Sequence, residues 1–177
     1  MKKLFVVLSV LGLFAASALE AKSYENSWRF EGLVGPNIDL RNWGGTQFGM
    51  DLKLGKGDML SGLLGFAFGG ANSVQMKLGV NIDIPFYFTF SKPRDFAVGP
   101  TFDAGPRFGF GGGLGTSIDF LNLGFGVRTA YKINDSFGVV ANLIHFSMSF
   151  VGWASGAGVN SNFAMAYDMR FGVFYLF

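Results

Sequence analysis

Apolar and polar or small residues alternate along segments of about ten residues, and this period of two constrains the fold more than any other feature of the chain. The clearest segment is VQMKLGVNIDI, from Val74 to Ile84, in which every even-numbered residue is apolar and every odd-numbered one is polar or Gly. Such alternation places the two kinds of side chain on opposite faces of a β-strand. The segment reaches the roughly 9 to 11 residues that a tilted membrane strand needs, whereas strands of globular proteins usually have about 5 to 6.

Seven further segments show the same alternation, some strongly and some weakly. Because the parity of the apolar positions changes near Ile144 and His145, we expect a β-bulge there. With Val74–Ile84, the sequence predicts eight strands. The other seven are Trp28–Ile38, Gln47–Leu54, Met59–Gly69, Phe96–Phe110, Leu121–Lys132, Phe137–Phe150 and Phe163–Phe177.

Two kinds of connection separate these segments. Compact polar turns, GKGD at 55–58, SKPRD at 91–95 and INDS at 133–136, alternate with a second set of connections that are short and rich in Gly. For eight strands that start from the periplasm, the compact turns would lie on the periplasmic side with both termini. The second set would face outward; its members are Asp39–Thr46, Gly69–Asn72, Gly111–Ser117 and Val151–Asn162.

The composition decides which face of the strands is outside. The chain has 22 Phe and 27 Gly, 50% hydrophobic residues and only 15% charged residues. The interior of an eight-stranded barrel is just filled by side chains, so the large apolar residues must face outward, where only lipid tolerates them. An open sheet edge would leave backbone groups without partners in hydrocarbon. The sequence therefore predicts an all-β fold, a closed antiparallel eight-stranded transmembrane β-barrel, with the aromatic cluster Phe86–Phe90 at a membrane interface.

The first residues predict export from the cytoplasm. Two lysines, a short apolar run from Leu4 to Phe14 and a stretch of small residues are typical of a secretory signal peptide. We expect the signal peptide to span residues 1–18, with residue 21 as a second candidate cleavage site, and the barrel to span 19–177 as one domain. The formal net charge of +2 gives no electrostatic reason to expect nucleic acid as a partner. The absence of Cys excludes disulfides and thiolate sites.

The last residues, RFGVFYLF, resemble the C-terminal β-signal of bacterial outer-membrane proteins. The residues that carry this resemblance are Arg170, Gly172, Tyr175 and Phe177, and it implies recognition by the barrel-assembly machinery through backbone pairing of the last strand. As an architecture, the whole mature chain resembles the small barrels of the OmpA/OmpX type. These resemblances imply residence in the bacterial outer membrane, with both termini periplasmic and with outer-membrane lipids as partners.

Charged residues on the polar faces should meet inside the barrel. Isolated charges in a narrow interior are costly, so we expect them to pair across the lumen and to plug it. The alternative is a small passive channel for small or apolar solutes, lined by the same residues. The predicted lumen network is Arg29, Glu31, Asp51, Lys53, Lys77, Asp83, Asp103, Arg107, Arg128, Lys132, Asp168 and Arg170.

His145 and Ser147 are the candidate catalytic residues. Their spacing in IHFSMS resembles that of outer-membrane lipid A deacylases, which implies a Ser nucleophile and a His base oriented by a carboxylate. Met148 stands where that family has Asn, and the parity of the strand places both candidates inside, away from a membrane substrate. We therefore expect His145 to be a hydrogen-bonded lumen residue and the protein to have no enzymatic activity and no cofactor. A single His and no Cys do not provide a usual zinc site.

Two prolines fall within one predicted strand. Pro100 and Pro106 have the same parity, so both lack an N–H toward the same neighbouring strand. Bulges, strand ends or interfacial water can absorb the missing donors. The alternative is a lateral weak point in the barrel wall, through which a lipid tail or apolar solute reaches the lumen.

The most general prediction remains a monomeric outer-membrane barrel with a structural or interaction role.

Overall fold

The computed structural model describes residues 27–40, 46–57, 59–69, 73–88, 90, 95–111, 115–155, 158–160 and 163–177. The predicted signal peptide, 1–18, lies outside the described residues. Within the described part, no helix is long and apolar enough to cross a membrane. The strands are β1 (Trp28–Asp39), β2 (Thr46–Lys56), β3 (Leu60–Phe68), β4 (Val74–Asp83), β5 (Phe86–Phe88), β6 (Phe96–Phe110), β7 (Thr116–Lys132), β8 (Phe137–Ser149), β9 (Gly152–Ala154), β10 (Gly158–Asn160) and β11 (Ala164–Leu176).

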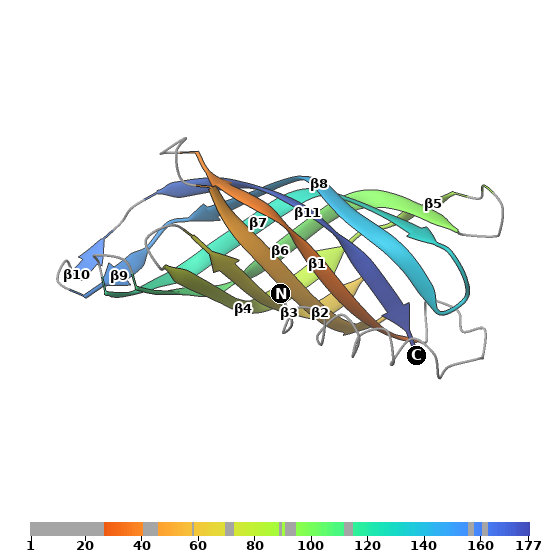
Figure 1. Ribbon diagram of the computed structural model, residues 1–177, viewed down its shortest axis with the longest axis horizontal. Helices are drawn as coiled ribbons and strands as arrows, with labels where there is room; N and C mark the ends of the chain where they lie inside the picture. Colours follow the sequence, from red (N-terminus) through yellow and green to blue (C-terminus); the bar gives the residue numbers. More distant parts are fainter. Residues whose placement is uncertain are drawn as a thin grey trace, which may run out of the picture.

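The strands close into an eight-stranded barrel, in which two of the eight wall strands are each made of two shorter strands (Figure 1). β1 pairs with both β2 and β11, which joins the two ends of the sheet. β4 and β5 both pair with β6 and form one wall strand, which is interrupted at Ile84 and Pro85. β8 and β9 likewise both pair with β7, whereas β10 pairs with β9 beyond the rim. All pairings are antiparallel, so the predicted fold class is confirmed.

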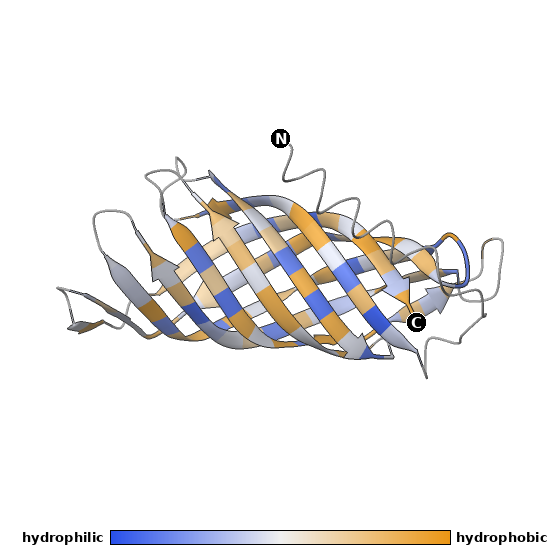
Figure 2. Ribbon diagram, turned by 60° about the horizontal axis from the view of Figure 1, so that its bottom comes forward, coloured by the Kyte–Doolittle hydropathy of each residue, from blue (hydrophilic) through white to orange (hydrophobic). Residues whose placement is uncertain are grey.

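The two faces of the sheet differ as the alternation predicts. Apolar side chains such as Phe102, Phe125 and Phe171 are exposed on the outside, and the polar residues of the same strands are buried inside. Figure 2 shows the resulting alternation of hydrophobic and hydrophilic bands along each strand. The interior is not entirely polar, because an apolar cluster fills part of it; the cluster comprises Leu33, Ala97, Ala130, Val140, Phe174 and Leu176.

The predicted bulge in β8 is confirmed. Its register against both β7 and β11 shifts between Asn142 and His145, and the adjacent residues Leu143 and Ile144 are both exposed on the outer surface. A second, unpredicted bulge lies in β7, where the register against β6 shifts between Asp119 and Asn122. In both strands the extra residue turns two neighbouring apolar side chains toward lipid.

Two predicted outer connections are corrected. The sequence predicts a loop at Gly111–Ser117, but β7 already begins at Thr116 and pairs with β6 up to Phe110. It also predicts a loop at Val151–Asn162, yet this segment contains β9 and β10. β7 runs past the barrel rim and offers an edge to β9, so tertiary pairing creates strands of three residues, too short to show alternation in the sequence.

The ends of β2 and β7, where two of the compact turns begin, lie at the same end of the barrel as the C-terminus and the start of β1 (Figure 1). At this end the N–H of Trp28 donates to the carbonyl of Phe177 at 2.9 Å, and the N–H of Gly57 donates to the carbonyl of Ser27. The turn at 133–136 is fixed by the side chain of Asn134, which accepts hydrogen bonds from two following backbone N–H groups. Most of SKPRD, residues 91–94, lies outside the described residues.

Candidate functional site in the barrel lumen

Four charged side chains form a cluster in the half of the lumen nearer the C-terminus, and we call it the ion quartet: Arg29 and Glu31 of β1, Asp83 of β4 and Arg128 of β7. Arg29 lies 2.9 Å from both Glu31 and Asp83, from Nε to Oε1 and from Nη2 to Oδ2. Arg128 pairs with Glu31 and approaches Asp83 at 3.4 Å. The four side chains are between 0% and 6% exposed. Two cations and two anions thus neutralise one another in a space without bulk water.

Neutral and cationic side chains of β2, β4 and β6 extend the quartet. Lys53 donates to Asn81 Oδ1 at 2.8 Å, and the amide of Asn81 donates to Asp83 at 2.8 Å. The hydroxyl of Thr101 also donates to Asn81. Asn81 therefore connects Lys53 to the quartet, and the hydrogen bonds satisfy polar groups that would be costly to bury alone.

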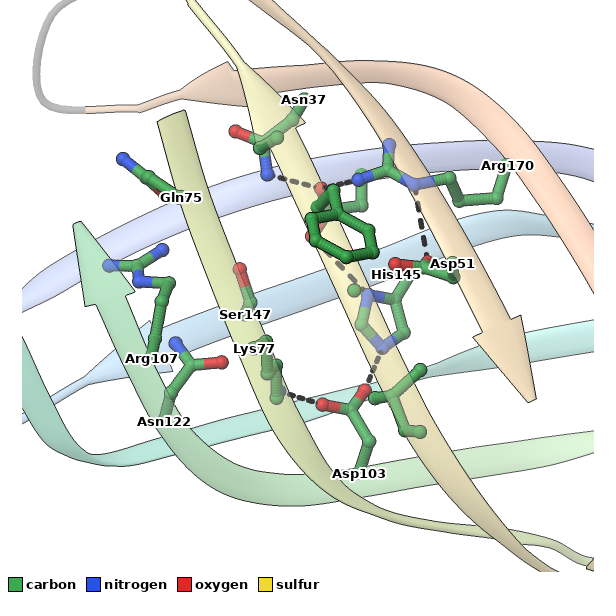
Figure 3. Close-up of a pocket in the computed structure, with 15 residues that line it drawn as sticks. Asn37, Asp51, Gln75, Lys77, Asp103, Arg107, Asn122, His145, Ser147 and Arg170 are labelled. Atoms are coloured by element: carbon green, nitrogen blue, oxygen red, sulfur yellow. Dashed lines mark hydrogen bonds and ion pairs between the residues drawn. The ribbon is translucent and has the colours of Figure 1, made fainter. Parts of the chain in front are cut away.

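A second ionic layer lies near the middle of the barrel and centres on His145 (Figure 3). Its Nε2 is 2.7 Å from Asp103 Oδ2, and its Nδ1 is 3.5 Å from Asp168 Oδ2. Lys77 pairs with Asp103 on one side of the lumen. On the other side Arg170 pairs with Asp168 at 3.0 Å. We call this group the histidine layer.

Arg170 serves more partners than any other cation in this layer. Its Nε lies 3.2 Å from Asp51 Oδ2, and its Nη1 donates to the carbonyls of Gly35 and Pro36 at 3.1 and 2.7 Å. Asn37 donates its amide to Asp168 nearby. These contacts tie β11 to β1 and β2 across the seam that closes the barrel.

Two small cavities that share lining residues lie beside the histidine layer and toward the far rim. The first, of about 60 Å³, is lined by Asp51, Lys77, Asp103, His145 and Arg170 among other polar groups. The second, of about 50 Å³, reaches the far ends of β1, β2 and β11 at Asp39, Gln47 and Ala164. Both are lined by Asn37, Gln75, Arg107 and Ser147. We call this space the vestibule.

Arg107 stands in the vestibule wall, paired with a residue that the sequence analysis missed. Its Nη2 is 2.6 Å from Asp119 Oδ2 and 3.0 Å from the hydroxyl of Ser149. The side chains of Arg107 and Asp119 are 19% and 26% exposed, against at most 6% in the quartet. This pair therefore meets solvent that the quartet does not.

Comparison with known proteins is informative only at the level of structure, since neither a protein-family model nor a curated protein sequence matches the chain. Neisserial surface protein A is similar in structure, with a TM-score of 0.51 and 11% identity over 85% of this chain and 96% of that one.

The fold is that of a small transmembrane β-barrel.

Two further structures align at lower scores. The N-terminal β-barrel domain of Pseudomonas aeruginosa OprF gives a TM-score of 0.49 at 12% identity, over 86% of this chain and 98% of that domain. A major outer membrane protein of Thermus thermophilus gives 0.49 at 16% identity, over 85% and 98%. With its closed ring of eight wall strands, the chain has the architecture of the OmpA/OmpX-type barrels.

Eleven of the twelve residues predicted for the lumen of the barrel contribute to these two ionic layers or to the vestibule. The exception is Lys132, which pairs at 3.7 Å with Asp135 in the adjacent turn. The main omission is Asp119, because the bulge in β7 shifts the parity of the strand before Leu121. The sequence does carry a signal for this shift, since Phe120 and Leu121 are two adjacent apolar residues within an alternating pattern.

His145 and Ser147 both line the vestibule, as the strand parity predicts. Both ring nitrogens of His145 face carboxylate oxygens, which only accept hydrogen bonds, so both contacts are hydrogen bonds when each nitrogen carries a proton. A ring held in this way is not positioned to take a proton from Ser147. Among the described residues, no group of three His, Asp or Glu side chains could hold a metal ion.

The residues of the predicted β-signal divide between the two faces of β11. Arg170 points into the lumen, whereas Tyr175 and Phe177 lie on the outer side with their rings stacked at a centroid distance of 6.2 Å. Gly172 faces the backbone of β1, where an added Cβ would lie 1.9 Å from the carbonyl oxygen of Gly32. A larger residue at position 172 would therefore push β11 away from β1.

Proposed function

We propose that this barrel is a monomeric integral protein of the bacterial outer membrane whose lumen does not conduct solutes and whose role is structural or based on interactions. The ion quartet is the observation that carries the proposal. Its four charges are paired with one another across the lumen, so a passing ion would have to break contacts that exclude water. Both termini would lie on the periplasmic side, together with the compact turns.

The apolar cluster of the interior supports the same proposal. Phe174 and Leu176 of β11 are each 1% exposed, although they alternate with residues of the outer surface. Large apolar side chains in a narrow barrel fill volume and offer no partner to a hydrated ion. Charged and apolar groups together therefore obstruct the half of the lumen nearer the C-terminus.

A small passive channel is the second candidate, and the vestibule favours it. Polar groups line both of its cavities, from the far rim down to His145. A channel would use this space as its entrance and would require the quartet to separate transiently. The two candidates thus differ in whether the quartet opens.

Purified protein in planar lipid bilayers distinguishes them. We expect little steady conductance at low applied voltage, because the quartet stays paired. Large and stable single-channel currents from the unmodified protein would instead favour the channel. On a detergent gel, a lower mobility after boiling than before boiling would show that the sample holds a closed barrel. Co-fractionation of the protein with the outer membrane would test its location.

We propose no enzymatic role, because His145 is held between two carboxylates. His145→Ala and Ser147→Ala should each leave the acylation of membrane lipids unchanged in a host that expresses the protein. Loss of a lipid-modifying activity in both variants would contradict this part of the proposal.

A further inference from the structure

A small hairpin projects beyond the rim of the barrel at the end away from the C-terminus (Figure 1). It consists of β9 and β10, and β9 pairs with the first residues of β7. We call β9, β10 and residues 116–120 of β7 the rim sheet. In the described part of the chain, β10 forms the outer edge of this sheet.

The rim sheet has two different faces. Ile118, Trp153 and Val159 lie opposite one another on three neighbouring strands and so share one face. The next register positions, Ser117, Ala154 and Gly158, share the other face and are small. Val159 is 70% exposed and Trp153 is 37% exposed, so the apolar face is open.

The strand register connects this face to the membrane-facing surface of the barrel. Ile118 lies opposite Phe108 of β6, and Phe108 lies opposite Met76 of β4. The same row continues around the outside of the barrel through paired residues of successive strands. From β1 to β10 its members are Val34, Met50, Phe66, Met76, Phe108, Ile118, Trp153 and Val159, all apolar.

The apolar row ends where polar residues begin. Two positions nearer the tip of the rim sheet, the N–H of Thr116 donates to the hydroxyl of Ser155, and the N–H of Ser155 donates to the carbonyl of Thr116. Toward the barrel, the rings of Phe150 and Phe163 pack at a centroid distance of 5.7 Å, and Phe120 is exposed. A change from aromatic to polar residues along a strand is typical of the boundary between lipid and water.

We propose that the apolar face of the rim sheet binds lipids of the leaflet at this end of the barrel, with Trp153 and Val159 at the boundary between acyl chains and headgroups. Continuity with the membrane-facing surface identifies lipid as the partner. An indole suits this depth because its ring is apolar and its N–H finds a polar partner. The inference rests on the transmembrane fold and does not depend on whether the lumen conducts.

Fluorescence of Trp153 in vesicles tests the proposal. Trp28→Phe with Trp43→Phe leaves Trp153 as the only tryptophan, and phosphatidylcholine brominated at defined depths serves as the quencher. We expect the strongest quenching from lipids brominated near the headgroup. Quenching by aqueous iodide with no effect of any brominated lipid would overturn the proposal, and so would quenching that depends on the protein-to-lipid ratio, which indicates a second copy as the partner.

Two aspartate variants of the single-tryptophan protein sharpen the test. Val159→Asp should reduce the quenching by brominated lipid at least about two-fold, because a carboxylate at the lipid boundary is unfavourable. Ala154→Asp places the same charge on the opposite face and should leave the quenching unchanged. Equal effects of the two variants would overturn the assignment of the face. A sister protein that retains only Trp28, at the other end of the barrel, verifies insertion in each sample.

Discussion

His145 of β8 and Asp103 of β6 lie 2.7 Å apart, from Nε2 to Oδ2, although β7 separates their two strands in the sheet. The contact therefore crosses the lumen instead of following the barrel wall. Asp168 of β11 holds the other ring nitrogen, so one imidazole connects three strands. This arrangement makes His145 the centre of the histidine layer.

His145→Ala should destabilise the barrel by on the order of 2 kcal/mol, below the roughly 3 to 5 kcal/mol for removing one partner of a fully buried pair. The effect is smaller because Lys77 and Arg170 still neutralise the two carboxylates. Urea unfolding in detergent micelles measures it. A double-mutant cycle with Asp103→Ala should give a coupling energy above about 1 kcal/mol, and strict additivity would contradict a direct interaction.

The two arginines Arg128 and Arg107 should differ in their contributions to stability. Arg128→Ala leaves Glu31 and Asp83 buried with one cation fewer, so we expect a loss near the 3 to 5 kcal/mol range for buried pairs, about 3 kcal/mol or more. Arg107→Ala should cost about 1 kcal/mol or less, because its pair with Asp119 is partly exposed. Comparison of the two unfolding free energies under identical conditions tests this order, and equal losses would contradict the difference in burial.

Glycine at position 124 makes room for Asp103. A Cβ added there would lie 2.1 Å from Asp103 Oδ2, so Gly124→Ala should displace the carboxylate and destabilise the barrel by about 1 to 3 kcal/mol. Gly62→Ala is the matched control, because its Cβ would meet nothing nearer than 3.7 Å. Similar unfolding curves for the two variants would show that the space beside Asp103 is not required.

At Pro100, the lateral weak point that the prolines predict would lie at the seam between β6 and the interrupted strand formed by β4 and β5. The N–H of Ile84 donates to the carbonyl of Pro100 at 2.9 Å, but Pro100 has no N–H to return. A small cavity at this break is lined by Pro85, Pro100, Asp83 and Arg128. We expect amide hydrogens of this seam to exchange faster than those between β2 and β3.

The matching variant is Pro100→Ala, which restores a donor opposite Ile84. It should slow the exchange at this seam and leave the pairing of β2 with β3 unchanged. Uniform protection around the unmodified barrel would rule out a lateral weak point. Rapid exchange confined to the seam would support it.

The fold was predictable because a membrane barrel repeats one simple pattern. Alternation placed Asp83 and Asp103 on the polar face of their strands, since a period of two leaves a side chain only two directions, and the composition assigned that face to the interior. It did not predict that Asp103 meets His145, because contacts across the lumen depend on how far the strands are staggered around the barrel. Asp119 was missed because the bulge at Phe120 reverses the parity, and β9 because three residues show too little alternation.

Conductance of a variant with an opened ion quartet tests the central claim most directly. Glu31→Ala with Arg128→Ala removes one anion and one cation, keeps the net charge and leaves Arg29 paired with Asp83. We predict that this double variant conducts in planar bilayers whereas the unmodified barrel does not. The control, Lys132→Ala with Asp135→Ala, removes a pair of opposite charges at the turn after β7. The lumen of this control should stay closed. A double variant as silent as the unmodified protein, or an unmodified protein that already conducts steadily, would contradict the claim that the quartet closes the lumen.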